Sequence, residues 1–403
     1  MMAQAIITRK GGGSVPGEAT ITFNNSSPTS MISLKRQTPT SLSQSRYCLA
    51  ATTLGNYALF GGGIDNSTKY STVDAYNSSL TRTTPTALSQ SRYCLAAASV
   101  GNYALFGGGY SSSYVSTVDA YDTSLTRTTP TTLSQGRENL AATRNGNHYA
   151  IFGGGNNNTS YFSTVDAYNT SLTRTTPTTL SQGRKNLAAT RNGDYVLFGG
   201  GYNGASYLST VDAYNTSLTR TTPTSLSQSR YCLAATNVSD YALFGGGSSS
   251  NGIHNTVDAY DSSLTRTTPT SLSQSRHDLS ATSISSKYAL FGGGSNGRFK
   301  SSTVDAYDSS LTRTIPQSLW LPCAELASAY VGAYALFGGG QQESYYGILV
   351  VNAYSRIVNI QVFPGTKYKL NTMENEQTSS TFQKLEFSIP LNGYLKIQNA
   401  DIS

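Results

Sequence analysis

The dominant feature of the sequence is a short apolar run followed by three glycines, which recurs seven times. The phenylalanine before each Gly-Gly-Gly stands at Phe60, Phe106, Phe152, Phe198, Phe244, Phe291 and Phe337, with spacings of 46, 46, 46, 46, 47 and 46 residues. A period in the forties is typical of propeller blades and of paired-helix solenoids. The repeat therefore restricts the fold to a few modular architectures before any single residue is considered.

Each repeat contains four β-like segments separated by turn residues. In the first repeat these segments span 47–54, 57–60, 70–76 and 80–84. Gly55-Asn56 and Asn77-Ser78-Ser79 are turn signals, and Pro85 ends the fourth segment. No 12-residue window shows an apolar stripe of helical period, which excludes helical solenoids. We therefore predict an all-β fold, a seven-bladed β-propeller of four-stranded blades.

The repeated glycines have a structural explanation in such a fold. A Cβ would clash where the second strand of a blade meets its neighbours, and glycine allows the positive φ needed to leave the strand. A phosphate-binding loop is excluded, because no helix follows the glycines.

The repeat resembles the Kelch family in three features. These are a glycine doublet after an apolar strand (Gly61-Gly62), a tyrosine on the third strand (Tyr76) and an arginine that opens the first strand (Arg46). The resemblance covers about residues 34–356, but the tryptophan of the family, expected near Thr83, is absent from every repeat. The resemblance implies a propeller that binds partners through the face formed by the connections between second and third strands and between blades.

The repeat and the segments that flank it divide the chain into three predicted parts. Residues 1–30 form an extended N-terminal segment, residues 31–356 the Kelch-like propeller, and residues 357–403 a small C-terminal β module or docking tail. Either residues 31–39 or residues 357–363 could supply the outer strand of the last blade. We favour the N-terminal segment, in which Leu34 aligns with Leu80 of "LTRTTP", because it joins the chain ends and closes the ring.

Charge and composition exclude several classes of partner. Residues 34–356 hold 22 Lys and Arg against 16 Asp and Glu. Twelve of the cations and six of the anions recur at fixed repeat positions, which describes a ladder around a scaffold and not a basic stripe. We therefore expect no nucleic-acid partner. No apolar run approaches the roughly 18 residues of a membrane span, and the first twenty residues lack a secretory core, so we expect no membrane association. The four cysteines, at Cys48, Cys94, Cys232 and Cys323, are predicted to be reduced thiols.

The sequence gives little evidence for a catalytic or a metal site. His148, His254 and His277 occupy unrelated repeat positions, so they predict neither a metal site nor a catalytic triad. We expect no catalytic residue, no bound metal, no cofactor and no enzymatic activity. A propeller enzyme that acts on glycans remains a less favoured alternative.

Two arginine series and one aspartate series recur. We predict that Asp74 and its equivalents face Arg82 and its equivalents across the hairpin of third and fourth strands, as a structural pair. The second arginine series opens the first strands near the channel mouth, where it could bind an anion or an acidic sugar. Its members are Arg46, Arg92, Arg137, Arg184, Arg230 and Arg276. We favour the alternative that each guanidinium donates hydrogen bonds to carbonyl groups of an adjacent crossing, the connection between two blades.

The connections between second and third strands vary from repeat to repeat, while the strands themselves repeat almost verbatim. They are rich in Tyr, Ser, Asn and Gly, a composition typical of adaptable recognition loops. Unconstrained surface loops would also vary, but six of the seven keep an aromatic residue. The candidate ligand-binding residues are Tyr70, Tyr110, Tyr114, Tyr161, Phe162, Tyr202, Tyr207, Phe299, Tyr345 and Tyr346.

The opening "AQAIITRKGG" resembles the start of some tail and adsorption proteins of phages that infect Gram-positive bacteria. This resemblance implies a virion protein assembled in the bacterial cytoplasm. The predicted function is a non-catalytic binding module that recognises a host-surface glycan or protein. Other virion structural proteins would contact its N- and C-terminal segments, and homo-oligomer formation stays open. The alternative is a non-viral lectin or adhesin, secreted or at the cell surface.

Overall fold

The computed structural model describes residues 19–23, 30–193, 195–343, 345–361, 368–372, 384–387 and 394–398. The chain divides into two compact units, residues 36–354 and residues 1–35 with 355–403. Every regular element in the described ranges is a β-strand. No described residue belongs to a helix that could cross a lipid bilayer.

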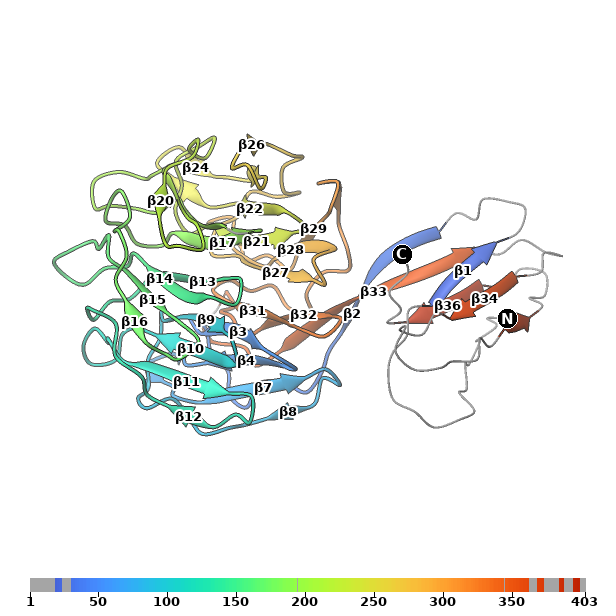
Figure 1. Cartoon of the computed structure of the whole chain (residues 1–403), viewed down its shortest axis with the longest axis horizontal. Helices are drawn as coiled ribbons and strands as arrows, with labels where there is room; N and C mark the ends of the chain where they lie inside the picture. Colours follow the sequence, from blue (N-terminus) through green and yellow to red (C-terminus); the bar gives the residue numbers. More distant parts are fainter. Residues whose placement is uncertain are drawn as a thin grey trace. The chain divides into compact units, whose positions relative to one another are not determined.

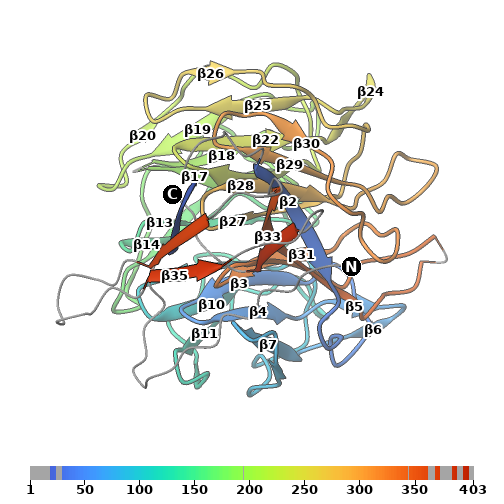
Figure 2. The ribbon, with the colours of Figure 1, turned by 90° about the vertical axis from the view of Figure 1, so that its right-hand side faces the viewer.

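The larger unit is a seven-bladed β-propeller, as predicted from the repeat (Figure 1). The first blade is an antiparallel sheet of β3 (Ala50–Leu54), β4 (Tyr57–Gly61), β7 (Val73–Asn77) and β8 (Arg82–Thr83) in that order. Five further blades repeat this order. Figure 2 shows the first strands β3, β27 and β31 near the middle and β26 at the rim.

The strands of blades two to six have closely similar bounds. They are β9 (Ala96–Val100), β10 (Tyr103–Gly107), β11 (Val118–Asp122) and β12 (Arg127–Thr128); β13 (Ala141–Asn145), β14 (Tyr149–Gly153), β15 (Val165–Tyr168) and β16 (Arg174–Thr175); β17 (Ala188–Asn192), β18 (Tyr195–Gly199), β19 (Val211–Tyr214) and β20 (Arg220–Thr221); β21 (Ala234–Val238), β22 (Tyr241–Gly245), β25 (Val257–Tyr260) and β26 (Arg266–Thr267); and β27 (Ser280–Ile284), β28 (Tyr288–Gly292), β29 (Val304–Asp308) and β30 (Arg313–Thr314). Two-residue strands pair within two of the connecting loops, β5 (Ile64–Asp65) with β6 (Thr68–Lys69) and β23 (Ser248–Ser249) with β24 (Gly252–Ile253).

The N-terminal strand closes the ring, which confirms the favoured alternative. The last blade has the order β2 (Ser30–Gln37), β33 (Val351–Gln361), β32 (Tyr334–Gly338) and β31 (Ala327–Val331). Residues 357–361 instead continue β33 and pair with β36 (Tyr394–Gln398). Arg36 Nη1 donates to the carbonyl of Ser318 at 2.7 Å, as Arg82 Nη1 does to Ser41 at 3.0 Å in the first blade.

The core lies between neighbouring blades and explains the glycine triplet. Phe106 of the second blade packs against the first blade, where a Cβ on Gly61 would stand 2.8 Å from its ring. Gly62 has a φ of +70°, and a Cβ there would stand 2.6 Å from the carbonyl oxygen of Arg92. The predicted clash is therefore with the next blade around the ring, and the same contact recurs between Gly338 and Phe60 where the ring closes.

A closed ring of seven backbone hydrogen bonds surrounds the axis where the blades begin. Six of its members follow a strand-opening arginine by two residues, Glu325 follows Cys323 by two, and all seven hold a left-handed φ of 51–56°. Each N–H donates to the carbonyl of the equivalent residue in the preceding blade, at 2.9–3.0 Å. The ring comprises Cys48, Cys94, Asn139, Asn186, Cys232, Asp278 and Glu325. This conformation starts the first strand at Ala50 and not at residue 47 as predicted, and the cysteines at these positions carry free thiols.

The smaller unit contains a three-stranded sheet of β1 (Ala19–Phe23), β34 (Tyr368–Thr372) and β35 (Lys384–Phe387). β1 belongs to the N-terminal segment predicted to be extended, and it pairs with a strand of the C-terminal segment predicted to be a small β module. The predictions for the N-terminal segment and the C-terminal module also cover residues that lie outside the described ones, namely 1–18, 24–29, 362–367, 373–383, 388–393 and 399–403.

Candidate functional site

The variable residues of each blade meet in a small three-stranded arrangement, which we call the loop face. It consists of the residue after the strand-opening arginine and the connection between second and third strands. In the second blade Tyr93 pairs with Tyr110, which pairs in turn with Tyr114. The N–H of Tyr93 donates to the carbonyl of Tyr110 at 3.1 Å, and the reverse bond measures 2.9 Å. Main-chain atoms therefore fix this face and leave its side chains free to differ.

A continuous chain of four tyrosine rings crosses blades three to five of the loop face. The ring centroids of Tyr161 and Tyr202 are 5.9 Å apart, those of Tyr202 and Tyr207 5.2 Å, and those of Tyr207 and Tyr231 5.0 Å. The ammonium of Lys185 lies 5.7 Å from the centre of the Tyr161 ring. The four tyrosines and this cation form the tyrosine chain, an amphipathic surface with one positive charge.

A second aromatic cluster lies on the second blade. The Tyr110 ring is 5.9 Å from that of Tyr93 and 5.1 Å from that of Tyr114. Lys69 of the first blade lies over the Tyr110 ring and donates to the carbonyl of Ser111. The hydroxyl of Tyr114 donates to the Asn158 side chain in the third blade. Contacts between neighbouring loops thus join the aromatic residues of several blades.

Asparagine side chains stiffen these loops from within. Oδ1 of Asn203 accepts from the N–H groups of Ala205 at 3.0 Å and Ser206 at 2.7 Å. The same turn forms at Asn157 and Asn296. Each of these side-chain oxygens already accepts two backbone hydrogen bonds from its own turn. The asparagines therefore shape the loops, although the loop composition had suggested that they contact a ligand.

The remaining aromatic candidates also lie in these connections but make different contacts. Tyr70 and Phe162 are half-buried at equivalent positions, and their carbonyls accept from the N–H groups of the next strand-opening arginines at 3.1 Å. Phe299 is 53% exposed beneath the guanidinium of Arg298. Tyr345 and Tyr346 are 73% and 58% exposed in the last blade. The residue after the strand-opening arginine also differs between blades in the sequence, but Tyr93, Tyr231 and Lys185 were not among the candidate residues.

The strand-opening arginines are not accessible to a ligand, and this corrects their place among the binding candidates. All six side chains are fully buried. The set Arg46, Arg92, Arg137, Arg184, Arg230 and Arg276 instead pairs with the recurring aspartates of the third strands, at 2.5–2.7 Å in the first five blades. Each guanidinium also donates to backbone carbonyls, as the preferred alternative predicted. These carbonyls, such as those of Phe60 and Thr72 for Arg46, lie at the end of the second strand and before the third strand, and not in a crossing between blades.

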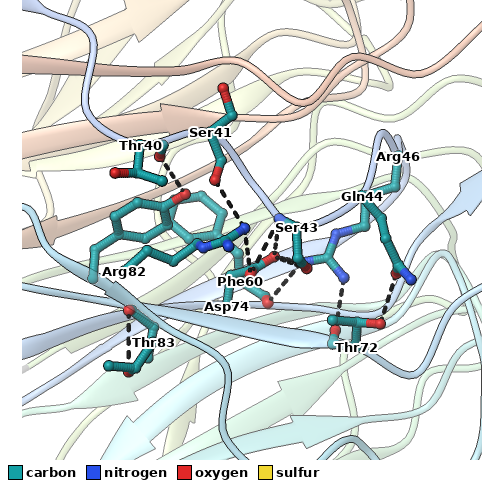
Figure 3. Close-up of polar contacts among 12 residues, drawn as sticks. Thr40, Ser41, Ser43, Gln44, Arg46, Phe60, Thr72, Asp74, Arg82 and Thr83 are labelled. Atoms are coloured by element: carbon teal, nitrogen blue, oxygen red, sulfur yellow. Dashed lines mark hydrogen bonds and ion pairs between the residues drawn. The ribbon is translucent and has the colours of Figure 1, made fainter.

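Figure 3 shows the first of these centres. Nη2 of Arg46 donates to Oδ2 of Asp74 at 2.6 Å, and Nη1 donates to the carbonyl of Thr72 at 2.7 Å. The backbone N–H and the hydroxyl of Ser43 donate to the same carboxylate. The aspartate therefore holds the segment before the first strand against the end of its own blade.

The second arginine of each centre is more exposed. Arg82 lies opposite Tyr76 in the strand register, so it reaches Asp74 diagonally, at 3.5 Å, and does not face it directly as predicted. Its side chain is 25% exposed. Burial lowers the pKa of the Arg46 guanidinium, and the charge of Asp74 opposes that shift. Six such centres are structural ion pairs, as the recurrence of the aspartate predicted.

Two titratable groups outside these ion pairs have distinctive surroundings. Nδ1 of His277 lies 2.7 Å from Oδ2 of Asp278, and burial raises the pKa of Glu138. Among the described residues, no three His, Cys, Asp or Glu side chains are grouped so that they could hold a metal ion.

Comparison with known proteins supports the fold. No protein-family model and no curated protein matches the sequence. The solved structure titled "Structure of YjhT" superimposes with a TM-score of 0.54 at 12% identity and covers 69% of this chain and 99% of that chain. At this identity the likeness concerns the propeller fold alone.

Proposed function

We propose that the protein is a non-catalytic binding module that recognises a glycan or a protein surface through the loop face. The observation that carries this proposal is the tyrosine chain, which joins Tyr161, Tyr202, Tyr207 and Tyr231 across three blades. Rings in edge and tilted contact form a rigid apolar surface bordered by hydroxyl groups. Such a surface suits a sugar ring or an apolar side chain at little cost in conformational entropy.

The rigidity of the loop backbone supports the same function. The turns at Asn157 and Asn203 and the bridges within each blade fix the loops without using the tyrosine side chains. The Tyr161 ring also lies over Gly204, where a Cβ would approach within 2.5 Å of it. A preformed aromatic surface loses little freedom when a ligand binds. The Kelch resemblance implies partner binding through this same face.

We further propose that the module belongs to a phage virion and attaches it to a host surface. This part rests on the resemblance of the opening segment "AQAIITRKGG" to phage tail and adsorption proteins. Other virion proteins would contact the N- and C-terminal segments. A lectin or adhesin of non-viral origin would use the same face. Electron microscopy of the source particles with an antibody to this chain tests the origin, and unlabelled particles would contradict the virion proposal.

Binding of the full chain to a glycan array and to bacterial cell-wall preparations tests the role of the face. The change is Tyr161→Ala combined with Tyr207→Ala. Removing a central aromatic anchor costs about 1–3 kcal/mol, so we expect each change to weaken binding by about 5- to 150-fold. The melting temperature should stay nearly constant, because both side chains lie outside the core between the blades.

Ile315→Thr is the matched control. Ile315 is 56% exposed, follows the fourth strand of its blade, and aligns with a threonine in the other complete repeats. It should bind like the unmodified chain. Normal binding by the tyrosine variant, together with loss of binding when residues 364–403 are deleted, would assign recognition to the tail. New reducing ends in the polysaccharide incubations would contradict the non-catalytic part of the proposal.

A further inference from the structure

Two arginines break the repeat inside the propeller, at a position that lines the axis. They are Arg144 and Arg191, the fourth residues of β13 and β17. The equivalent residues in the other blades are uncharged, namely Thr53, Ser99, Asn237, Ser283 and Tyr330. All seven positions line one cavity of about 210 Å³, formed by the inner strands of the blades. Neighbouring blades thus place two positive charges in one confined space.

The other polar residues along this cavity wall, in the part of the chain that the structure describes, are neutral. Among the described residues that line the cavity, none is Asp or Glu, and most of the polar ones are Thr or Ser. Nη2 of Arg144 donates to the hydroxyl of Tyr330 across the axis at 2.9 Å, so the partner of this guanidinium is a neutral group. Burial lowers the pKa of Arg191, and the charge of Arg144 lowers it further. The recurring arginines of the blades, in contrast, each have a carboxylate partner.

We infer that the axial cavity is a binding site for a small oxyanion, namely the carboxylate or phosphate group of a small ligand. A guanidinium offers a planar pair of N–H donors that matches the two oxygens of such a group. One oxyanion between Arg144 and Arg191 would relieve their repulsion, and threonine and serine hydroxyls would complete its hydrogen bonds. The cavity is far larger than a single water molecule requires, so it can admit the ligand that carries the anion.

This site is separate from the tyrosine chain, and the two can be tested independently. The experiment is isothermal titration of the full chain with inorganic phosphate and with glucuronate, at low ionic strength. The variants are Arg144→Ser and Arg191→Asn, which introduce the residues that blades two and five already carry at this position. Because the chain folds with those residues there, the variants should fold, and circular dichroism and melting curves check this.

We expect one saturable site for at least one probe, binding at least 10-fold weaker in each single variant, and no saturable binding in the double variant. Arg174→Gln is the control, because Arg174 lies on the fourth strand of its blade, outside both the axial cavity and the loop face, and it should bind like the unmodified chain. Binding of phosphate alone identifies a phosphate ligand, and binding of glucuronate alone a carboxylate ligand. Failure of both probes to bind the unmodified chain, or unchanged binding in the double variant, would overturn the inference.

Discussion

The buried ion pairs of the blades allow a quantitative test of how the propeller is held together. In the third blade Asp166 is fully buried, and its Oδ2 accepts from Nη2 of Arg137 at 2.6 Å and from the hydroxyl of Ser134 at 3.0 Å. Replacing Asp166 by Asn keeps the size of the side chain but leaves the fully buried guanidinium of Arg137 without a counter-charge. Because breaking one side of a buried pair costs about 3–5 kcal/mol, we expect Asp166→Asn to lower the free energy of unfolding by about 3 kcal/mol.

In the last blade two uncharged residues replace the arginine and the aspartate of this ion pair. This blade has Cys323 where the others have arginine and Asn352 where they have aspartate, both almost completely buried. The Asn352 side chain accepts from the backbone N–H of Trp320 at 2.8 Å, as the aspartates accept from serine N–H groups. The double variant Arg137→Cys with Asp166→Asn reproduces this arrangement. It should be less destabilised than the sum of the single variants, by about 2 kcal/mol or more.

Urea unfolding of the full chain, followed by the fluorescence of the single tryptophan, measures these differences. Arg174→Gln is the matched control, since Arg174 is the exposed partner of the same carboxylate at 3.5 Å and should cost less than about 1 kcal/mol. The reasoning is refuted if Asp166→Asn destabilises no more than Arg174→Gln. Strict additivity of the two changes in the double variant would refute it equally.

Two further predictions concern ring closure and pH. Deleting residues 1–40 removes β2 and exposes the edge of β33, so we expect a large fall in melting temperature. Deleting residues 364–403 should leave the propeller folded. If the first truncated chain melts at the same temperature as the intact chain, this prediction is wrong. Burial raises the pKa of the third-strand tyrosines, as at Tyr168, above the value of about 10 in the unfolded chain. The unfolded chain therefore loses these protons first, and stability should fall as the pH rises above about 10, by up to about 1.4 kcal/mol per pH unit for each such tyrosine. Melting curves between pH 8 and 12 measure this, and a flat profile would show that the tyrosines ionise in the folded state.

The architecture could be predicted because the same local features, the turns and the glycine triplets, occur in every repeat. The spacing of the glycine triplets, the turns at Gly55 and Asn77 and the alignment of Leu34 with Leu80 were sufficient to predict seven four-stranded blades closed by the N-terminal strand. Each of these features acts within one blade or between its direct neighbours. Their agreement across seven copies made the assignment independent of any one residue.

The roles of the arginines could not be separated in the same way. A ring of ligand-binding guanidiniums and a set of buried ion pairs both place one arginine at the same position in every blade. The difference depends on the path of the chain before the first strand, where Arg46 pairs with Asp74 and Cys48 holds a left-handed turn. Cysteine, asparagine, aspartate and glutamate all occupy that turn position, so no residue type marks it. The contacts between tyrosines of different blades could not be predicted from the sequence either, because they depend on the rotation from one blade to the next.

The physical basis for variation on the loop face is that backbone atoms hold it together. The bridges between Tyr93 and Tyr110 and between Lys185 and Tyr202 use N–H and carbonyl groups only, as does the ring of seven hydrogen bonds around the axis. At these bridged positions a side chain can therefore change without loss of a backbone hydrogen bond, whereas Asp166 or Phe106 cannot change without loss of an ion pair or a core contact. The same freedom applies to the axial positions of Arg144 and Arg191, whose equivalents range from serine to tyrosine. Departures from the repeat are therefore most informative at positions where the backbone alone maintains the fold. At such positions binding chemistry can accumulate at little cost in stability.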